Sequence, residues 1–202
     1  MVQEGSDEWA QRSRIDELAG LISYHSDLYY NEATSEITDA EFDAMVDELK
    51  QLSPSHPQLN KVGSDPAPGS VKVDHLFPMR SLDKATEDEE VAHFVAETTA
   101  HGRQFVCQPK LDGSALSLEY RRGRLVRAAT RGNGERGEDV TANARRVSNI
   151  PESLDWDGDC HVRGEVVMPL DIFNSKYAQI APNPRNLAAG SLRQKKIESG
   201  KG

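Results

Sequence analysis

The sequence has few cysteines, no secretory signal and no long apolar run. Its only two cysteines, Cys107 and Cys160, fall in strand-like segments, and neither has a metal-ligating partner at short spacing. We therefore expect two buried free thiols in a reducing cytoplasm. The N-terminal segment MVQEGSDEWAQRSR lacks the basic-then-apolar order of a secretory signal, and no segment is apolar enough to span a bilayer.

The sequence also lacks an excess of positive charge. Its formal net charge of -9 disfavours nucleic-acid binding, because affinity for phosphate backbones depends on Lys and Arg displacing counterions. Acidic residues concentrate in the first half, whereas basic residues gather later, in RRGRLVR, ARR and LRQKK. This asymmetry permits one local basic face, although such runs more often form a solvated surface.

The remaining composition favours a folded, globular protein. Hydrophobic residues make up 37% and aromatic residues 6% of the 202 residues, which is unlike a disordered chain. This length is sufficient for one sizeable core with a small appended subdomain.

Helical periodicity marks three segments of the chain. Apolar residues from Arg14 to Tyr30 recur on one helical stripe. Thr38 and Glu41 form a capping-box pattern that opens a second helix, which stops near SPSHP. Thr86 and Glu89 repeat that pattern ahead of a third helix.

Strand-like runs follow the helices. QFVCQPK, SALSLEY and RLVRAATR alternate partly and are separated by LDG and RRG, which predicts an antiparallel meander. CHVRGEVVMP predicts a further strand, followed by a helix from about Leu170 and a loop, APNPRNLAAGSLRQ. The pattern predicts an α+β protein with a helical unit at 1–58, an extended linker at 59–75 and a sheet domain at 76–202.

Lys110 is the first candidate for chemistry. It precedes Asp112 and Gly113 at the end of a predicted strand, and a lysine amine becomes nucleophilic when burial or positive charge lowers its pKa. The four residues KLDG alone fit a plain hairpin with surface charges better. Further groups at strand ends and in the later segment favour a phosphate-handling, magnesium-using site. These groups are Arg131, Arg163, Glu165, Arg185 and Arg193.

Several motifs together point to one family. KLDG, ATRGNG followed by GEDVTANAR, RGEV and NPRNLAAGSLRQ, in this order, resemble the adenylation domain of the bacterial NAD-dependent DNA ligases, which are covalent nucleotidyltransferases. LYYNEATSEITDAEFDAM resembles the helical subdomain by which these ligases hold the nicotinamide mononucleotide (NMN) half of NAD. The resemblance runs from about Ile15 to Gln194 and implies an antiparallel-sheet, ATP-grasp-like ligase domain that is incomplete at its C-terminal end.

The resemblance implies a mechanism and a set of roles. Lys110 would attack the α-phosphorus of NAD, release NMN and carry AMP, which passes to the 5′-phosphate of a DNA nick before the nick is sealed. Tyr29 and Tyr30 would flank the nicotinamide ring, although the two tyrosines alone also fit a half-buried amphipathic helix. The other implied contacts are Asp39 and Asp43 to the nicotinamide charge or ribose, Ser81 and Leu82 to adenosine, Gln108 to adenine, Arg131 to ribose or phosphate, Glu165 to ribose or metal, Asp112 to Lys110 or Mg²⁺, and Arg185 and Arg193 to substrate or DNA.

The chain departs from the family pattern in three places. Gln108 stands where many members have glutamate, but its amide can still accept a hydrogen bond from adenine. Phe42 stands where tyrosine is common. The chain ends at KKIESGKG, before two lysine-bearing strand motifs, an OB-fold, a four-cysteine zinc module, helix-hairpin-helix repeats and a BRCT domain. We therefore expect part of a longer ligase, with zinc confined to those modules and little activity alone.

Two other functions remain open at this level. An ATP- or GTP-using nucleotidyltransferase would share KLDG but not the tyrosine-bearing helix or the NPRN block. A non-catalytic NAD- or DNA-binding remnant would keep the pocket without the chemistry. The ligase reading implies a cytoplasmic monomer that uses NAD and Mg²⁺ on nicked double-stranded DNA, with no membrane partner.

Overall fold

The computed structural model describes residues 2–32, 34–61, 63–65, 69–82 and 84–194, with side chains from residue 9 onward. The chain forms two compact units. The main unit comprises Met1–Met79 and Asp112–Gly202, and the insert unit comprises Arg80–Leu111. Helices and antiparallel sheets are both present, which confirms the predicted α+β class.

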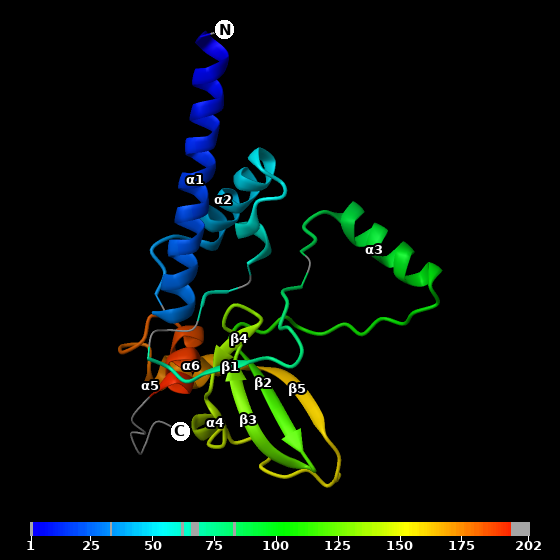
Figure 1. Ribbon diagram of the computed structural model, residues 1–202. Coiled ribbons are helices and arrows are strands. Elements are labelled where there is room, and N and C mark those ends of the chain that lie inside the picture. The colour runs from blue at the N-terminus through cyan, green and yellow to red at the C-terminus, as the bar shows by residue number, and fades with distance from the viewer. Residues whose placement is uncertain (1, 33, 62, 66–68, 83, 195–202) are drawn as a thin grey trace. The chain divides into compact units, whose positions relative to one another are not determined.

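Two antiparallel helices open the main unit (Figure 1). Helix α1 spans Val2–Asn31 and α2 spans Asp39–Leu52, so α1 begins well before the predicted Arg14. The early part of α1 is polar, and the apolar stripe used for the prediction therefore missed it. Leu18, Ile22 and Leu49 form the buried core of this helix pair.

Thr38 caps α2 as the sequence predicts. Its hydroxyl accepts a hydrogen bond from the backbone N–H of Glu41 at 3.2 Å, and the Glu41 carboxylate accepts one from the N–H of Thr38 at 2.7 Å. This reciprocal capping box is confirmed.

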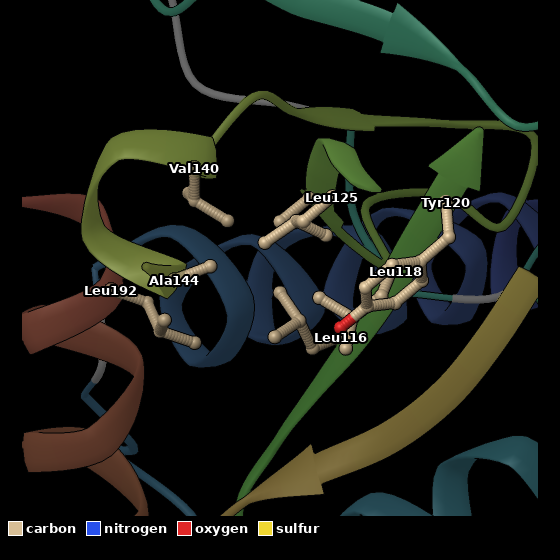
Figure 2. Close-up of a cluster of buried hydrophobic side chains, with 8 residues drawn as sticks. Leu116, Leu118, Tyr120, Leu125, Val140, Ala144 and Leu192 are labelled. Atoms are coloured by element: carbon tan, nitrogen blue, oxygen red, sulfur yellow. The ribbon is translucent and has the colours of Figure 1, made fainter. Parts of the chain in front are cut away.

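A three-stranded antiparallel sheet forms the second part of the main unit. Its order is β3-β2-β5, with β2 at Ser114–Arg121, β3 at Arg124–Thr130 and β5 at Cys160–Val166. Helices α4, Thr141–Ala144, and α6, Pro184–Arg193, contribute side chains to its core. Figure 2 shows this core, and its labelled residues are Leu116, Leu118, Tyr120, Leu125, Val140, Ala144 and Leu192.

The predicted strand QFVCQPK is wrong. The structure has no strand between residues 103 and 113. Strand β2 already pairs with β3 on one edge and with β5 on the other, so the segment before it has no free edge of β2 to join. Both cysteines are free, as expected, but Cys107 is exposed and Cys160 is only partly buried.

The predicted loop at 181–194 is also wrong, because most of it is helix α6. The Asn183 side chain accepts a hydrogen bond from the N–H of Asn186 at 2.8 Å, and Pro184 occupies the first turn. Both are helix-start signals. The preceding helix α5 spans Leu170–Lys176, as the sequence predicts.

The predicted linker is extended only in part. A 3₁₀ turn, η1, occupies Pro57–Asn60. Strand β1, Lys72–Asp74, then pairs antiparallel with β4, Arg136–Glu138. Residues 72–74 of the predicted linker are therefore a strand of the main unit.

The insert unit contains helix α3, Asp88–Ala100. The Glu90 carboxylate accepts hydrogen bonds from the N–H groups of Thr86 and Glu87, so the cap lies one residue later than the predicted Thr86 and Glu89 pair. Several apolar side chains of this unit are exposed, among them Leu82, Val91, Phe94, Val95, Phe105 and Val106.

The described helices lack the character of a membrane span. None of them combines the necessary length with the necessary apolar character.

Candidate functional site

Two adjacent tyrosines at the end of α1 each lie against an arginine. The guanidinium carbon of Arg185 is 4.3 Å from the ring centroid of Tyr29, and that of Arg131 is 4.9 Å from the ring centroid of Tyr30. The two tyrosine rings meet edge to face, with centroids 5.1 Å apart. Both contacts are within the range of cation–π attraction.

Separate elements bring these arginines to the tyrosines. Arg131 directly follows β3, and Arg185 lies in the first turn of α6. The main-chain oxygen of Arg131 lies 3.1 Å from Nε2 of His75, which follows β1. The site is therefore built where the helix pair, the three-stranded sheet and the β1–β4 pair meet within the main unit.

Asp112 joins this cluster through Arg185. The Nη1 group of Arg185 donates a hydrogen bond to Oδ1 of Asp112 at 2.6 Å. The Asp112 side chain is 74% exposed and that of Arg185 is 25% exposed. Screening by solvent keeps such a pair modest in energy, so its main effect is to orient the guanidinium.

Gly113 is required by packing beside Asp112. A Cβ at this position would lie 2.2 Å from the carbonyl oxygen of Val166 and 2.9 Å from Cγ1 of Val167. No side chain fits between β2 and the end of β5 there. The structure gives the glycine of KLDG a steric reason that the sequence did not indicate.

Tyr29 is held in its neutral form. Burial raises the pKa of Tyr29 to about 12, and the nearby Arg185 opposes this shift in part. The carboxylates of Asp112 and Asp39 act in the same direction as burial. The Tyr29 face is therefore a neutral aromatic surface in a region that contains both signs of charge.

Arg193 contacts a different partner. Its Nε lies 3.2 Å from Oε2 of Glu138, and both side chains are largely buried. The contact is an ion pair without hydrogen-bond geometry, since this Nε makes no hydrogen bond among the described residues. Burial lowers the pKa of Arg193, and the charge of Glu138 opposes that shift. Arg193 thus joins α6 to β4, and its role toward DNA stays a prediction.

The remaining predicted residues lie in two places. Ser81, Leu82, Gln108 and Lys110 belong to the insert unit, and each is exposed there. Asp39, Asp43 and Glu165 belong to the main unit and are also exposed. The geometry described above therefore rests on main-unit residues, and the roles predicted for the insert-unit residues stay predictions.

Asp112 and Glu165 are the carboxylates that the sequence analysis assigned to a magnesium ion. Among the residues that the structure describes, no group of three or more His, Cys, Asp or Glu side chains could hold a metal ion. Mg²⁺ in nucleotide sites usually takes one or two carboxylates and completes its shell with water and substrate phosphates. Asp112 precedes β2 by two residues, and Glu165 is the ladder partner of Ala115, so both lie at the same end of the β2–β5 pair.

Sequence reasoning found the tyrosines and arginines but missed how they meet. No local pattern links Tyr29 with Arg185 or Tyr30 with Arg131, because each contact joins residues far apart in the chain. The segment at residues 63–65, which contacts both sides of the site, was treated only as linker. Its Gly-Ser-Asp composition gave no signal beyond a turn.

Comparison with known families matches nearly the whole chain. Residues 8–67 match the DNA ligase-like, N-terminal NAD⁺-binding domain, and residues 69–201 match the NAD-dependent DNA ligase adenylation domain. The chain belongs to the NAD-dependent DNA ligase family.

Individual members of the family are similar along most of this chain. The DNA ligase of Methylorubrum extorquens is 42% identical over 95% of it, and that of Marinobacter nauticus is 41% identical over 92%. The DNA ligase of Rhodopseudomonas palustris is 42% identical over 89%. The chain spans only 26%, 30% and 28% of the lengths of these three relatives.

Proposed function

We propose that this chain carries the NAD-dependent adenylation step of DNA nick sealing. The observation that carries the proposal is the direct succession of an NAD⁺-binding match and an adenylation-domain match within one chain. The pairing of two tyrosines with two arginines at the junction of these regions supports it.

The proposed reaction begins on Lys110. Its neutral amine attacks the α-phosphorus of NAD, the bond from that phosphorus to the NMN oxygen breaks, and NMN leaves with the electron pair. The amine loses a proton and AMP stays joined to Lys110 through a nitrogen–phosphorus bond. The AMP then moves to the 5′-phosphate of a nick, and the neighbouring 3′-hydroxyl displaces it to seal the strand.

Tyr29 and Tyr30 suit the NMN half of NAD. The nicotinamide ring is a planar cation, and the faces of these tyrosines already attract the planar cations of Arg185 and Arg131. In this proposal Tyr29 and Tyr30 flank the nicotinamide ring, and Asp39 and Asp43 offset its positive charge or contact its ribose. Gln108, Ser81 and Leu82 would receive the adenosine half.

Arg131, Arg185 and Asp112 suit the phosphate-facing part of the site. Arginine forms paired hydrogen bonds with phosphate oxygens, and such preorganised donors stabilise the charge that develops during phosphoryl transfer. Asp112 orients Arg185 at 2.6 Å. Asp112 and Glu165 would hold Mg²⁺, which would neutralise charge on the phosphate oxygens when bound.

The proposed partner is nicked double-stranded DNA, with Arg185 and Arg193 on the side that meets it. We also propose that the protein acts as a monomer in the cytoplasm, in replication or repair. A non-catalytic NAD- or DNA-binding remnant is the second candidate. It predicts NAD binding without release of NMN.

The experiment uses the longest natural protein that contains these residues. It is incubated with a nicked duplex and Mg²⁺, and with NAD, ATP or neither. The proposal expects joined DNA and released NMN with NAD only. Joining with ATP would replace the proposal with an ATP-dependent enzyme, and NAD binding without NMN release would favour the remnant.

A further inference from the structure

The segment at residues 63–65 connects the tyrosine end of α1 with the turn that carries Arg131. On the α1 side, Nδ2 of Asn31 donates hydrogen bonds to the main-chain oxygen of Asp65 at 2.7 Å and to Oγ of Ser64 at 3.1 Å. The Ser64 hydroxyl donates to Oδ1 of Asp27 at 2.8 Å. Asn31 directly follows Tyr30 in the sequence, so these bonds hold the last helical turn of α1, which bears the tyrosines.

On the other side, the same segment holds the Arg131 turn. Oδ1 of Asp65 accepts a hydrogen bond from Nδ2 of Asn133 at 2.7 Å. The Asn133 side-chain oxygen in turn accepts from the N–H groups of Glu135 and Arg136 at 3.1 and 2.9 Å. Asn133 therefore uses its oxygen to shape its own turn and its amino group to hold Asp65.

Backbone packing reinforces this connection. Gly63 has a φ of 73°, and a Cβ on it would lie 2.1 Å from the carbonyl oxygen of Gly132. Any other residue type at position 63 would therefore have a strained backbone conformation and would clash with Gly132. The same Cβ would lie 3.5 Å from Nη2 of Arg131, so Gly63 is packed closely against the Arg131 turn.

We propose that Asp65 is a positioning residue for the NMN-binding tyrosines. Through Asn31 on one side and Asn133 on the other, it fixes the distance between the Tyr30 ring and the Arg131 guanidinium. A nicotinamide ring bound at the tyrosines then lies at a fixed distance from Arg131, the arginine that we propose faces phosphate. This inference rests on the proposed function, since it assigns Asp65 to the NAD step of that same site.

The proposal separates the NAD step from the later steps. NMN has left before AMP reaches DNA, so sealing of a nick that already carries 5′-AMP does not need the tyrosines in place. Loss of the Asp65 to Asn133 contact should therefore raise the KM for NAD more than it slows sealing of the adenylated nick, in which Arg131 still faces phosphate. A residue that served only stability would affect both activities together.

Four variants of the longest natural protein make the test specific. Asn133→Asp keeps the oxygen that shapes the turn but places a carboxylate against Asp65. Asp65→Asn keeps an oxygen that accepts from Asn133. The double variant Asp65→Asn with Asn133→Asp exchanges donor and acceptor and restores the contact. Asn174→Asp, on an exposed position of α5, makes the same charge change elsewhere.

The KM for NAD in self-adenylation is the first measurement. Asn133→Asp should raise it about five- to tenfold, as expected for a lost hydrogen bond with added repulsion. Asp65→Asn, the double variant and Asn174→Asp should remain within about twofold of the starting protein. An unchanged KM in Asn133→Asp, or a double variant as impaired as that single variant, overturns the role of Asp65.

Hydrogen exchange gives a measurement that does not depend on activity. The amides of Glu32 and Thr34 donate to the Leu28 oxygen at the end of α1. They should exchange faster in Asn133→Asp and recover in the double variant. Unchanged exchange overturns the proposed connection. Failure of the starting protein to release NMN from NAD would instead overturn the proposed function, and the exchange result would still test the connection.

Discussion

Arg185 lies between Asp112 and Tyr29. Its Nη1 donates a hydrogen bond to Asp112 at 2.6 Å, and its guanidinium carbon lies 4.3 Å from the Tyr29 ring centroid. The Arg185 side chain of α6 thus connects Asp112 with the end of α1. Tyr29, which the sequence assigned to the nicotinamide ring, and Asp112, which it assigned to Lys110 or Mg²⁺, share this arginine.

The ionisation of Tyr29 should occur unusually late. Its pKa is raised from 10.0 to about 12, mainly by burial. Because the folded pKa is the higher one, the resulting stabilisation is complete below pH 10 and is lost as the pH rises toward 12. Urea denaturation across this range should show a loss of stability that is smaller in Tyr29→Phe.

Arg185→Met tests the cause of that ionisation. The positive charge of Arg185 lowers the pKa of Tyr29, so its removal should delay ionisation further in an ultraviolet titration. Earlier ionisation of Tyr29 in this variant would contradict the contact between the two side chains.

Gly113 should not tolerate alanine, although Gly164 should. A Cβ at Gly113 would meet the Val166 oxygen at 2.2 Å, whereas a Cβ at Gly164 would meet nothing within 4 Å. Gly113→Ala should lower the free energy of unfolding by about 1–3 kcal/mol, the usual cost of overpacking. Gly164→Ala is the matched control on β5, and equal losses in chemical denaturation would count against the packing described at Gly113.

Thr38 should stabilise α2 through its hydroxyl. Thr38→Ala removes the acceptor for the Glu41 N–H and should cost about 1 kcal/mol of stability. Thr38→Ser retains that oxygen and should lose much less. The comparison is made by thermal or urea denaturation, and indistinguishable stabilities of the alanine and serine variants would show that the cap contributes little.

Features that are set by neighbouring residues can be predicted from the sequence alone. The cap at Thr38 and Glu41 depends on a spacing of three residues, and the hairpin of β2 and β3 depends on alternation around Gly123. The start of α6 depends on Asn183 and Pro184 in the same local way. Those signals were available in the sequence, and the expectation of a loop at 181–194 overlooked them.

The features that the sequence could not predict depend on distant partners. QFVCQPK has strand-like residues, but β5 occupies the edge of β2 that it would need. The contact of Tyr30 with Arg131, and of Asp65 with Asn133, likewise requires a folded main unit. The family resemblance supplied the identity of the site residues, whereas their contacts came from the structure.

The most direct test of the account is the position of the AMP adduct. The longest natural protein that contains these residues is incubated with NAD and Mg²⁺, and its peptides are mapped by mass spectrometry, with Lys110→Ala as the control. The account predicts AMP on Lys110 in the starting protein and no adduct in Lys110→Ala. An adduct on another lysine, or one that persists in Lys110→Ala, would contradict it.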